Sequence, residues 1–367
     1  MVRVLHYIGS LQIGGSQALV MEWYRKIDRT KMQFDFVTFP EERKGSYDEV
    51  ERMGGRVFVC PRYSGFNHFE FVKWWSDFLE EHPEYRIVHG HIYSCASIYM
   101  PVVKKHGRIA IAHSHSTSNG KGFASVVKAV LQLPIRHIAN YMFSCSDLAG
   151  IWLYGKKAVK KPNYRMIPNC VDCRRFAFSE EIREDVRKEL GIGEKAFVVG
   201  HVGRFHESKN HEFLVRVFVE ILKQRPDAML LLVGDGDLLE PTKTLCGELG
   251  ITDHVIFTGA QLEPDRYYQA MDLFLFPSVW EGLPVSVVEA QANGLPCLLS
   301  DTITKDVWLT DLVTYETLEK DAKHWAGEAV KFAGKTREPI GGNELEKLKG
   351  FDSNQVVADL QEFYLSL

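Results

Sequence analysis

The sequence predicts an α/β protein built from two doubly wound, Rossmann-like domains with parallel sheets. Short apolar runs recur along the chain, amphipathic segments separate them, and the series starts twice. Apolar runs that alternate with helices are typical of parallel strands buried on both faces and joined by crossover helices. The chain has 367 residues, which exceeds what one hydrophobic core usually supports, so two domains are expected.

The first series contains six runs that we expect to be strands. They lie at residues 2–8, 34–39, 57–60, 87–91, 109–113 and 141–145, with helical patterns at 16–27 and 69–81 among the segments between them. The second series contains five, at residues 197–202, 229–233, 255–258, 273–276 and 296–300. A charged helical pattern at 180–190 precedes the second series.

The boundary between the domains is predicted near residues 168–172, where a short strand pattern meets turn residues. This gives an N-terminal domain, 1–170, and a C-terminal domain, 171–352. The amphipathic segment 353–367 is expected to be a helix that packs back on the first domain. Ligands of open parallel sheets bind beyond the carboxyl ends of the strands. If the two sheets face each other, the active site is expected in the central cleft.

The most informative stretch is 276–294. A strand ends at Pro277, and a loop carrying Ser278 and Gly282 follows. Pro284 suits the first helical position, because its missing N–H is not needed there. Gly294 suits the left-handed residue after the helix. The N-terminus of this helix, just past a strand end, is a predicted site for a diphosphate.

Two carboxylates belong to the same stretch, Glu281 in the loop and Glu289 on the helix. Carboxylates beside a diphosphate would repel it unless they bind another group. Sugar hydroxyls are strong candidates, since carboxylates accept charge-assisted hydrogen bonds from them.

Two more loops follow strands. The loop after 197–202 carries Gly203, Arg204 and Lys209, and this combination of a close backbone turn and two cations suits a diphosphate. The loop after the first strand carries Gly14 and Gly15, where backbone N–H groups can approach an anion. Neither strand is followed by the G-x-G-x-x-G pattern of dinucleotide oxidoreductases, which argues against that class.

Two further features allow more than one interpretation. Asp235 and Asp237 resemble a metal-binding D-x-D pair, but they directly follow a buried strand, where a tight turn also explains them. His113 and His115 close a strand of the first domain. We expect them either to be structural or to line the acceptor side of a site.

Charge and composition limit the partners. The net charge of −4 does not suggest nucleic acid, but residues 100–165 hold eleven Lys or Arg against one acid. This basic block suits a phosphate-bearing substrate or an acidic membrane surface. Seven scattered cysteines favour a reducing compartment. No apolar run approaches the length of a membrane span, about 20 residues, and no signal peptide is expected. We therefore expect a cytoplasmic protein. The basic block would allow it to bind peripherally at the inner membrane face.

Together these residues resemble the family 4 glycosyltransferases, which have the GT-B architecture. The resemblance covers nearly the whole chain. It rests on Gly14-Gly15, on Gly203-Arg204 with Lys209, on 234–236, and most specifically on Glu281-Gly-Leu-Pro followed by Glu289. The tract 144–155 is similar to members that build capsular polysaccharides or exopolysaccharides.

The resemblance implies a role for each matched residue. Arg204 and Lys209 would neutralise the donor diphosphate, and Gly15 would offer its N–H to the distal phosphate. Glu289 would bind the ribose and Glu281 the transferred sugar. The N–H groups of Gly282 and Leu283 would bind the sugar or the phosphate. The backbone at 257–260, which includes Thr258 and Gly259, would contact the base. His115, with His113 as the second choice, would line the acceptor side. Such enzymes retain the anomeric configuration and need neither a metal nor another cofactor.

The expected function is therefore a retaining transfer of a hexose or N-acetylhexosamine. The donor would be a nucleotide-diphosphate sugar, with UDP favoured, and the acceptor a saccharide, lipid-linked in our reading of the basic block, in capsular or exopolysaccharide biosynthesis. A GT-B-like nucleotide-sugar epimerase and a non-catalytic subunit of a polysaccharide assembly complex remain alternatives. The sequence departs from the common family form at Asn210, where Gly is frequent, and at Gln17, where an acid is frequent.

Overall fold

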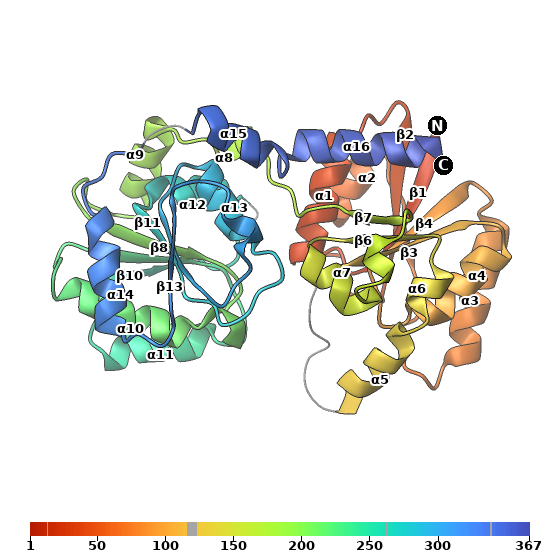
Figure 1. Cartoon of the computed structure of the whole chain (residues 1–367), viewed down its shortest axis with the longest axis horizontal. Coiled ribbons are helices and arrows are strands. Elements are labelled where there is room, and N and C mark those ends of the chain that lie inside the picture. Colours follow the sequence, from red (N-terminus) through yellow and green to blue (C-terminus); the bar gives the residue numbers. More distant parts are fainter. Residues whose placement is uncertain (13, 116–122, 262, 338–339) are drawn as a thin grey trace. The chain divides into compact units, whose positions relative to one another are not determined.

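The computed structural model describes residues 1–12, 14–115, 123–261, 263–337 and 340–367. The chain folds into two compact units, which are described separately (Figure 1). Unit 1 comprises Met1–Cys170 and Ser353–Leu367, and unit 2 comprises Val171–Asp352.

Unit 1 contains a seven-stranded sheet in the order β3-β2-β1-β4-β5-β6-β7. All of its strand pairs are parallel. The strands are β1 (Val2–Gly9), β2 (Met32–Thr38), β3 (Val57–Val59), β4 (Tyr85–Gly90), β5 (Ile109–Ser114), β6 (Tyr141–Ser144) and β7 (Tyr164–Met166). The six predicted strands are confirmed, each within two residues at its ends. Asp35 is a charge inside β2, and Arg3 neutralises it through two hydrogen bonds of 2.6 Å.

Helices cover both faces of this sheet. They are α1 (Gly15–Lys26), α2 (Tyr47–Arg52), α3 (His68–Glu81), α4 (Ala96–Lys105), α5 (Phe123–Gln132), α6 (Ile135–Ile138), α7 (Asp147–Tyr154), η1 (Ala158–Lys160) and, from the end of the chain, α16 (Ser353–Ser366). The apolar faces of α1 and α16 share one core with β1 and β2. The helices α3 and α4 close the other face. The segment far away in sequence, α16, therefore completes the core of unit 1.

Unit 2 contains a six-stranded sheet in the order β10-β9-β8-β11-β12-β13, again with all pairs parallel. The strands are β8 (Val198–Val202), β9 (Met229–Val233), β10 (Val255–Phe257), β11 (Leu273–Phe276), β12 (Cys297–Ser300) and β13 (Val313–Glu316). The sequence predicted the first five of these strands and missed β13 at the edge. Two Rossmann-like units with parallel sheets confirm the predicted fold class.

The helices of unit 2 again form two layers. They are α8 (Cys173–Phe176), α9 (Glu180–Glu189), η2 (Glu207–Lys209), α10 (His211–Leu222), α11 (Leu239–Glu248), η3 (Thr252–His254), α12 (Asp265–Ala270), α13 (Val285–Ala292), η4 (Lys305–Val307), α14 (Ala322–Ala329), η5 (Val330–Phe332) and α15 (Gly342–Lys349). One core packs α12 and α13 on the sheet, and the other packs α10 and α14. The arrangement leaves the loops at the carboxyl ends of the strands to carry the candidate site.

Candidate functional site

In unit 2 the strand order reverses between β8 and β11, which lie side by side. The chain proceeds from β8 to β9 and β10 on one side, then crosses to β11, β12 and β13 on the other. A reversal of this kind opens a crevice beyond the carboxyl ends of the two strands, and open α/β sheets bind ligands there. The predicted donor residues lie mainly in the two loops that flank this point.

The loop after β8 packs directly against the turn after β9. The Gly203 N–H donates to the Val233 carbonyl at 3.0 Å, and the Phe205 N–H donates to the Asp235 carbonyl at 2.9 Å. A Cβ on Gly234 would lie 2.0 Å from the Gly203 carbonyl oxygen, so only glycine allows this approach. Phe205 is buried beneath the loop, and the Arg204 side chain is exposed above it.

The turn interpretation of 235–237 agrees with the structure. A carboxylate oxygen of Asp235 accepts the N–H of Gly236 at 2.7 Å, and the φ angle of Gly236 is 150°. Asp235 and Asp237 are both exposed. Side-chain capping of the turn is therefore enough to explain the first aspartate.

Lys209 and Glu281 bring the two loops together. The Lys209 Nζ lies 2.7 Å from Glu281 Oε1, and the side chains are only 14% and 13% exposed. The same ammonium lies 4.7 Å from the centre of the Phe276 ring at the end of β11. A second link is the hydrogen bond from the Val279 N–H to the Ser208 carbonyl, 2.8 Å.

Asn210 explains one departure from the common family form. Its φ and ψ are 56° and 47°, the left-handed region, and it is the only non-glycine residue with positive φ in the described part of the chain. Asparagine tolerates this conformation better than other residues with a side chain, and glycine adopts it freely. The Asn210 side-chain amide also donates to the Pro277 carbonyl at 3.2 Å, which again links the two loops.

The loop after β11 leads into α13. Pro284 is the N-cap residue, with φ −74° and ψ 99°, and Val285 is the first helical residue. Our placement of Pro284 at the first helical position is therefore wrong by one residue, because its extended ψ still belongs to the loop. The predicted end is confirmed: Gly294 has a φ of 70°, and the Leu295 N–H bonds back to the Ala290 carbonyl at 2.9 Å.

The loop itself is partly buried. Ser278 is 0% exposed, so its side chain is buried, and its backbone carbonyl accepts a hydrogen bond from the Thr302 hydroxyl at 2.9 Å. Gly282 is half-buried and Leu283 is buried. The first N–H groups of α13 have no acceptor within the helix, as at every helix start.

Glu289 has a partner that the sequence did not indicate. The Tyr268 hydroxyl, from α12, donates to Glu289 Oε2 at 2.7 Å. Tyr268 is fully buried, and burial, together with the carboxylate of Glu289, raises its pKa well above 10. The phenol therefore stays protonated and holds the half-buried carboxylate in one orientation.

Thr258 and Gly259 follow β10 on the other side of the β9 turn. The Gly234 N–H donates to the Gly259 carbonyl at 2.9 Å, and the Thr258 N–H donates to the Leu232 carbonyl at 3.1 Å. The backbone of this segment is thus continuous with the turn that supports the β8 loop.

Unit 1 holds the remaining predicted residues. Gly14 is the N-cap of α1 and Gly15 is its first residue, and a Cβ on Gly15 would meet no atom within 4 Å. His113 is 0% exposed, whereas His115, directly after β5, is half-buried. The Nδ1 of His113 lies 3.1 Å from His89 Nε2, so this side chain faces a neighbouring histidine within the fold.

Comparison with known proteins identifies the family. The sequence model described as glycosyl transferases group 1 matches residues 182–315, which contain both loops of the site. EpsF of Bacillus subtilis (strain 168), which is named as a glycosyltransferase, is 31% identical over 99% of this chain and 96% of its own length. The chain belongs to the group 1 glycosyltransferases.

Other relatives of this glycosyltransferase have more specific names. The capsular polysaccharide biosynthesis glycosyltransferase CapH of Staphylococcus aureus is 24% identical over 100% of the chain and 99% of CapH. An Escherichia coli enzyme named UDP-Gal:alpha-D-GlcNAc-diphosphoundecaprenol alpha-1,3-galactosyltransferase is 27% identical over 59% of the chain and 58% of that enzyme. HepE of Anabaena, solved with UDP and with UDP-glucose, superimposes with TM-scores of 0.77 and 0.77 over 100% of both chains, at 18% and 17% identity. The likeness to HepE shows the shared GT-B fold.

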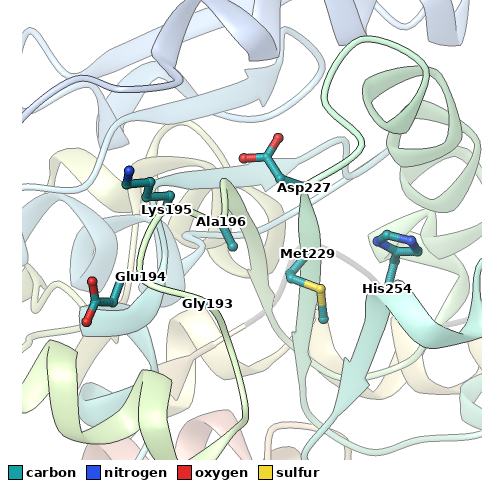
Figure 2. Close-up of a pocket in the computed structure, with 7 residues that line it drawn as sticks. All are labelled: Gly193, Glu194, Lys195, Ala196, Asp227, Met229 and His254. Carbon is teal, nitrogen blue, oxygen red and sulfur yellow. The ribbon is translucent and has the colours of Figure 1, made fainter.

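An open pocket of the glycosyltransferase lies at the other end of the unit 2 sheet, where the strands begin (Figure 2). Its lining residues precede β8, β9 and β10 or, in the case of Met229, begin the strand, and they are Gly193, Glu194, Lys195, Ala196, Asp227, Met229 and His254. Two of its polar groups serve the fold: Asp227 pairs with Arg225 at 2.8 Å, and His254 Nδ1 lies 3.0 Å from the Ala228 carbonyl. Because this pocket lies at the amino ends of the strands, we assign it no part in the transfer reaction.

Proposed function

We propose that this glycosyltransferase transfers a hexose or N-acetylhexosamine from a UDP-sugar to a saccharide acceptor, with retention of configuration. The observation that carries the proposal is the Lys209–Glu281 pair at the reversal point of the unit 2 sheet. A nucleotide sugar has an anionic diphosphate bonded directly to a sugar rich in hydroxyls. A cation and a carboxylate 2.7 Å apart suit the two sides of that bond.

The cations would serve the leaving group. As the anomeric bond breaks, negative charge develops on the diphosphate. Lys209 and the N–H groups at the start of α13 are held in place by the fold and would meet this charge without reorganising, and the exposed guanidinium of Arg204 would join them. In this proposal they neutralise the leaving group without a metal ion at the diphosphate. Retention would follow if the departing phosphate takes the acceptor proton on the same face.

The other predicted residues complete the donor site. Glu289, oriented by Tyr268, would accept hydrogen bonds from the ribose hydroxyls, and the backbone at Thr258 and Gly259 would read the base. Glu281 and the N–H groups of Gly282 and Leu283 would hold the sugar. UDP is favoured because HepE was solved with UDP and UDP-glucose and the Escherichia coli relative is named for UDP-Gal.

The acceptor side is assigned to unit 1. We infer a role for His115 on this side, with His113 behind it, and a donor-phosphate contact for Gly14 and Gly15. The name of the Escherichia coli relative specifies a sugar on diphosphoundecaprenol, and CapH is named for capsular polysaccharide. These names support a lipid-linked saccharide acceptor and a role in capsular or exopolysaccharide biosynthesis.

Helix α5 of unit 1 has a surface that would bind an acidic membrane carrying a lipid-linked acceptor. Helix α5, which projects from the body of the unit in Figure 1, exposes Val126, Val127 and Val130 at 58%, 43% and 60%, and Leu133 follows it at 55%. Lys128 lies among these side chains. Apolar and basic side chains together favour peripheral binding to anionic lipids. None of the described helices is long and apolar enough to cross a bilayer.

The deciding experiment is a transfer assay with the purified full chain. Radiolabelled UDP-glucose, UDP-galactose, UDP-N-acetylglucosamine and GDP-mannose are each supplied with a lipid-diphosphate-linked N-acetylglucosamine. We expect transfer from one of the UDP-sugars, and proton NMR of the product should show the donor's anomeric configuration. Transfer with inversion would overturn the mechanism.

The same assay separates the alternatives. A sugar isomer formed from donor alone would indicate an epimerase. Donor binding without transfer to any of several saccharide acceptors would favour a non-catalytic subunit. Transfer from GDP-mannose alone would reject UDP while leaving the reaction class intact.

A further inference from the structure

Five histidines gather at the carboxyl ends of three neighbouring strands in unit 1. His6, His89 and His113 lie in β1, β4 and β5, and His91 and His115 directly follow β4 and β5. The order β2-β1-β4-β5 means that the strand order reverses between β1 and β4. The cluster therefore lies at the reversal point of the unit 1 sheet, where open parallel sheets bind ligands.

The rings approach one another through their nitrogens. The distance from His91 Nδ1 to His115 Nε2 is 2.7 Å, and from His91 Nε2 to His6 Nδ1 it is 3.0 Å. One nitrogen from each of His91, His113 and His115 lies within 4.8 Å of the other two. In a tetrahedral zinc site with Zn–N bonds of about 2.0–2.1 Å, ligand nitrogens lie about 3.3 Å apart. Small ring movements would suffice to reach that spacing.

We propose that His91, His113 and His115 form a binding site for one divalent transition-metal ion of the zinc type, with a fourth position open. Imidazole nitrogens suit zinc, copper and nickel rather than magnesium or calcium. Three histidine ligands and one open position are the arrangement of catalytic rather than closed structural zinc sites. The inference concerns unit 1 alone and does not rest on the proposed donor.

Burial favours these three ligands over the deeper set of His6, His89 and His91. All three members of the deeper set are buried, whereas His115 is half-buried and gives an ion a way in. The Nε2 of His113 is buried and has no hydrogen-bond partner among the described residues. The same holds for His6 Nε2 of the deeper set, so the exposure of His115 decides between the two sets. A buried ring nitrogen without a partner is costly, and a metal ion would satisfy it.

The remaining histidines provide outer partners for the proposed ligands. His91 Nε2 bonds to His6, and His113 Nδ1 lies 3.1 Å from His89 Nε2. His89 Nδ1 in turn lies 2.5 Å from the Tyr364 hydroxyl of α16. If each ligand donates the N–H of its other nitrogen outward, the lone pairs of His91 Nδ1 and His113 Nε2 face the ion. Histidines that bind metals are commonly oriented by such hydrogen bonds.

The test is metal binding by the full chain, purified without a polyhistidine tag. After removal of metals with a chelator, the protein is titrated with Co²⁺, and the visible spectrum reports the coordination geometry. We expect one Co²⁺ per chain with a four-coordinate spectrum, and displacement by Zn²⁺. His115→Gln should lower the affinity at least about 100-fold, because a ligand is lost, and His6→Gln only about 10-fold, because only an outer partner is lost.

A matched control is His106→Gln. His106 is a half-buried histidine of unit 1 that bonds to the Ser76 hydroxyl at 3.0 Å, outside the cluster, and its loss should leave binding unchanged. Thermal unfolding without metal verifies that each variant is folded. Anomalous scattering at the zinc edge from crystals of the wild-type chain locates the ion without any variant.

Three results would overturn the site. They are a folded wild-type chain that binds no Co²⁺, binding that is unchanged in His115→Gln, and an anomalous peak away from His91, His113 and His115. Equal loss of binding in His6→Gln and His115→Gln would also reject this ligand set.

Discussion

The ammonium of Lys209 and the carboxylate of Glu281 form a 2.7 Å ion pair in which both side chains are largely shielded from water. The pair connects the loop after β8 with the loop after β11. Removing one partner of a shielded pair leaves the other charge uncompensated, so either single variant is expected to lower the stability of the folded chain as well.

Lys209→Ala should weaken UDP binding, whereas Glu281→Gln should mainly lower kcat. A hydrogen bond to a charged group contributes about 1.5–3 kcal/mol, which corresponds to about 10- to 100-fold in the Kd of UDP for the lysine variant. Calorimetric titration with UDP measures the first effect and a transfer assay the second. Lys223→Ala is the matched control, since Lys223 pairs with Glu220 on the exposed face of α10. Wild-type UDP affinity in Lys209→Ala would remove this lysine from the donor site.

Arg204→Ala should reduce the transfer rate on the order of 10²-fold, the scale found when one donor to a developing negative charge is removed. Because Arg204 is exposed, the fold should remain stable, and the melting temperature should not change. Arg216→Ala, on the exposed side of α10 where Arg216 pairs with Glu212, provides the control. Unchanged turnover at saturating donor would exclude Arg204 from the reaction.

Asn210→Ala should be about 1–2 kcal/mol less stable than Asn210→Gly. Both variants lose the side-chain hydrogen bond to the Pro277 carbonyl, but alanine also places a Cβ in the left-handed region without the polar side chain that lets asparagine tolerate it. Thermal or urea unfolding measures the difference. Equal stability of the glycine and alanine variants would mean that the 56° φ angle is not maintained in solution.

His211 should make the protein less stable in acid. Burial lowers its pKa in the folded state to about 4, below the usual 6.5, and Lys209 adds to this effect. Below pH 6.5 the unfolded chain therefore binds a proton at His211, whereas the folded chain binds it only near pH 4. The free energy of unfolding falls as the pH drops from about 6.5 to about 4. His211→Phe would keep a ring beside Phe205, 4.1 Å away, without the titrating group. Its melting temperature should fall less between pH 7 and pH 5, and an identical fall in both proteins would contradict the assignment.

Val126→Glu and Val130→Glu should abolish binding to vesicles that contain acidic lipids, since each places a carboxylate on the exposed apolar face of α5. Binding of the unchanged chain should also weaken as salt rises, because screening reduces the contribution of the basic side chains. Sedimentation with phosphatidylglycerol vesicles measures both effects. Ile182→Glu, at a 41% exposed position on α9, is the control. Vesicle binding that survives both valine changes would exclude α5 as the contact.

The sequence was informative about the fold wherever strands are buried on both faces. Residues 229–233 and 273–276 were predicted with the observed ends. A continuous apolar run of this kind is stable only in a strand that is buried on both faces of the sheet. The edge strand β13 was missed, since Val313–Glu316 is mostly half-buried and mixes polar with apolar side chains. The start of β2 at Met32 was missed for a related reason: the polar Gln33 interrupts the apolar pattern, and its burial depends on a hydrogen bond from its side-chain amide to the Met53 carbonyl, 2.9 Å.

The candidate site was predictable where one loop carries several functional groups. The relationships that depend on strand order were not. Tyr268 reaches Glu289 from a different helix, and no local pattern links them. His115 and His113 were singled out from the sequence, but His6 and His89 are distant from them along the chain, and each alone resembles an ordinary polar residue of a strand. They become one cluster only because β1, β4 and β5 are adjacent in the sheet.

The place of α16 within unit 1 has a consequence for how the molecule is made. The strands of unit 1 leave the ribosome first, but the helix that covers their histidine-bearing face, with Val357, Leu360 and Tyr364, is synthesised only after all of unit 2. Until then the apolar face of β1 and α1 lacks part of its cover. Domains usually fold in the order of their synthesis. Here the earlier-synthesised unit must wait for the later one, so premature termination within unit 2 would leave neither unit able to complete its core.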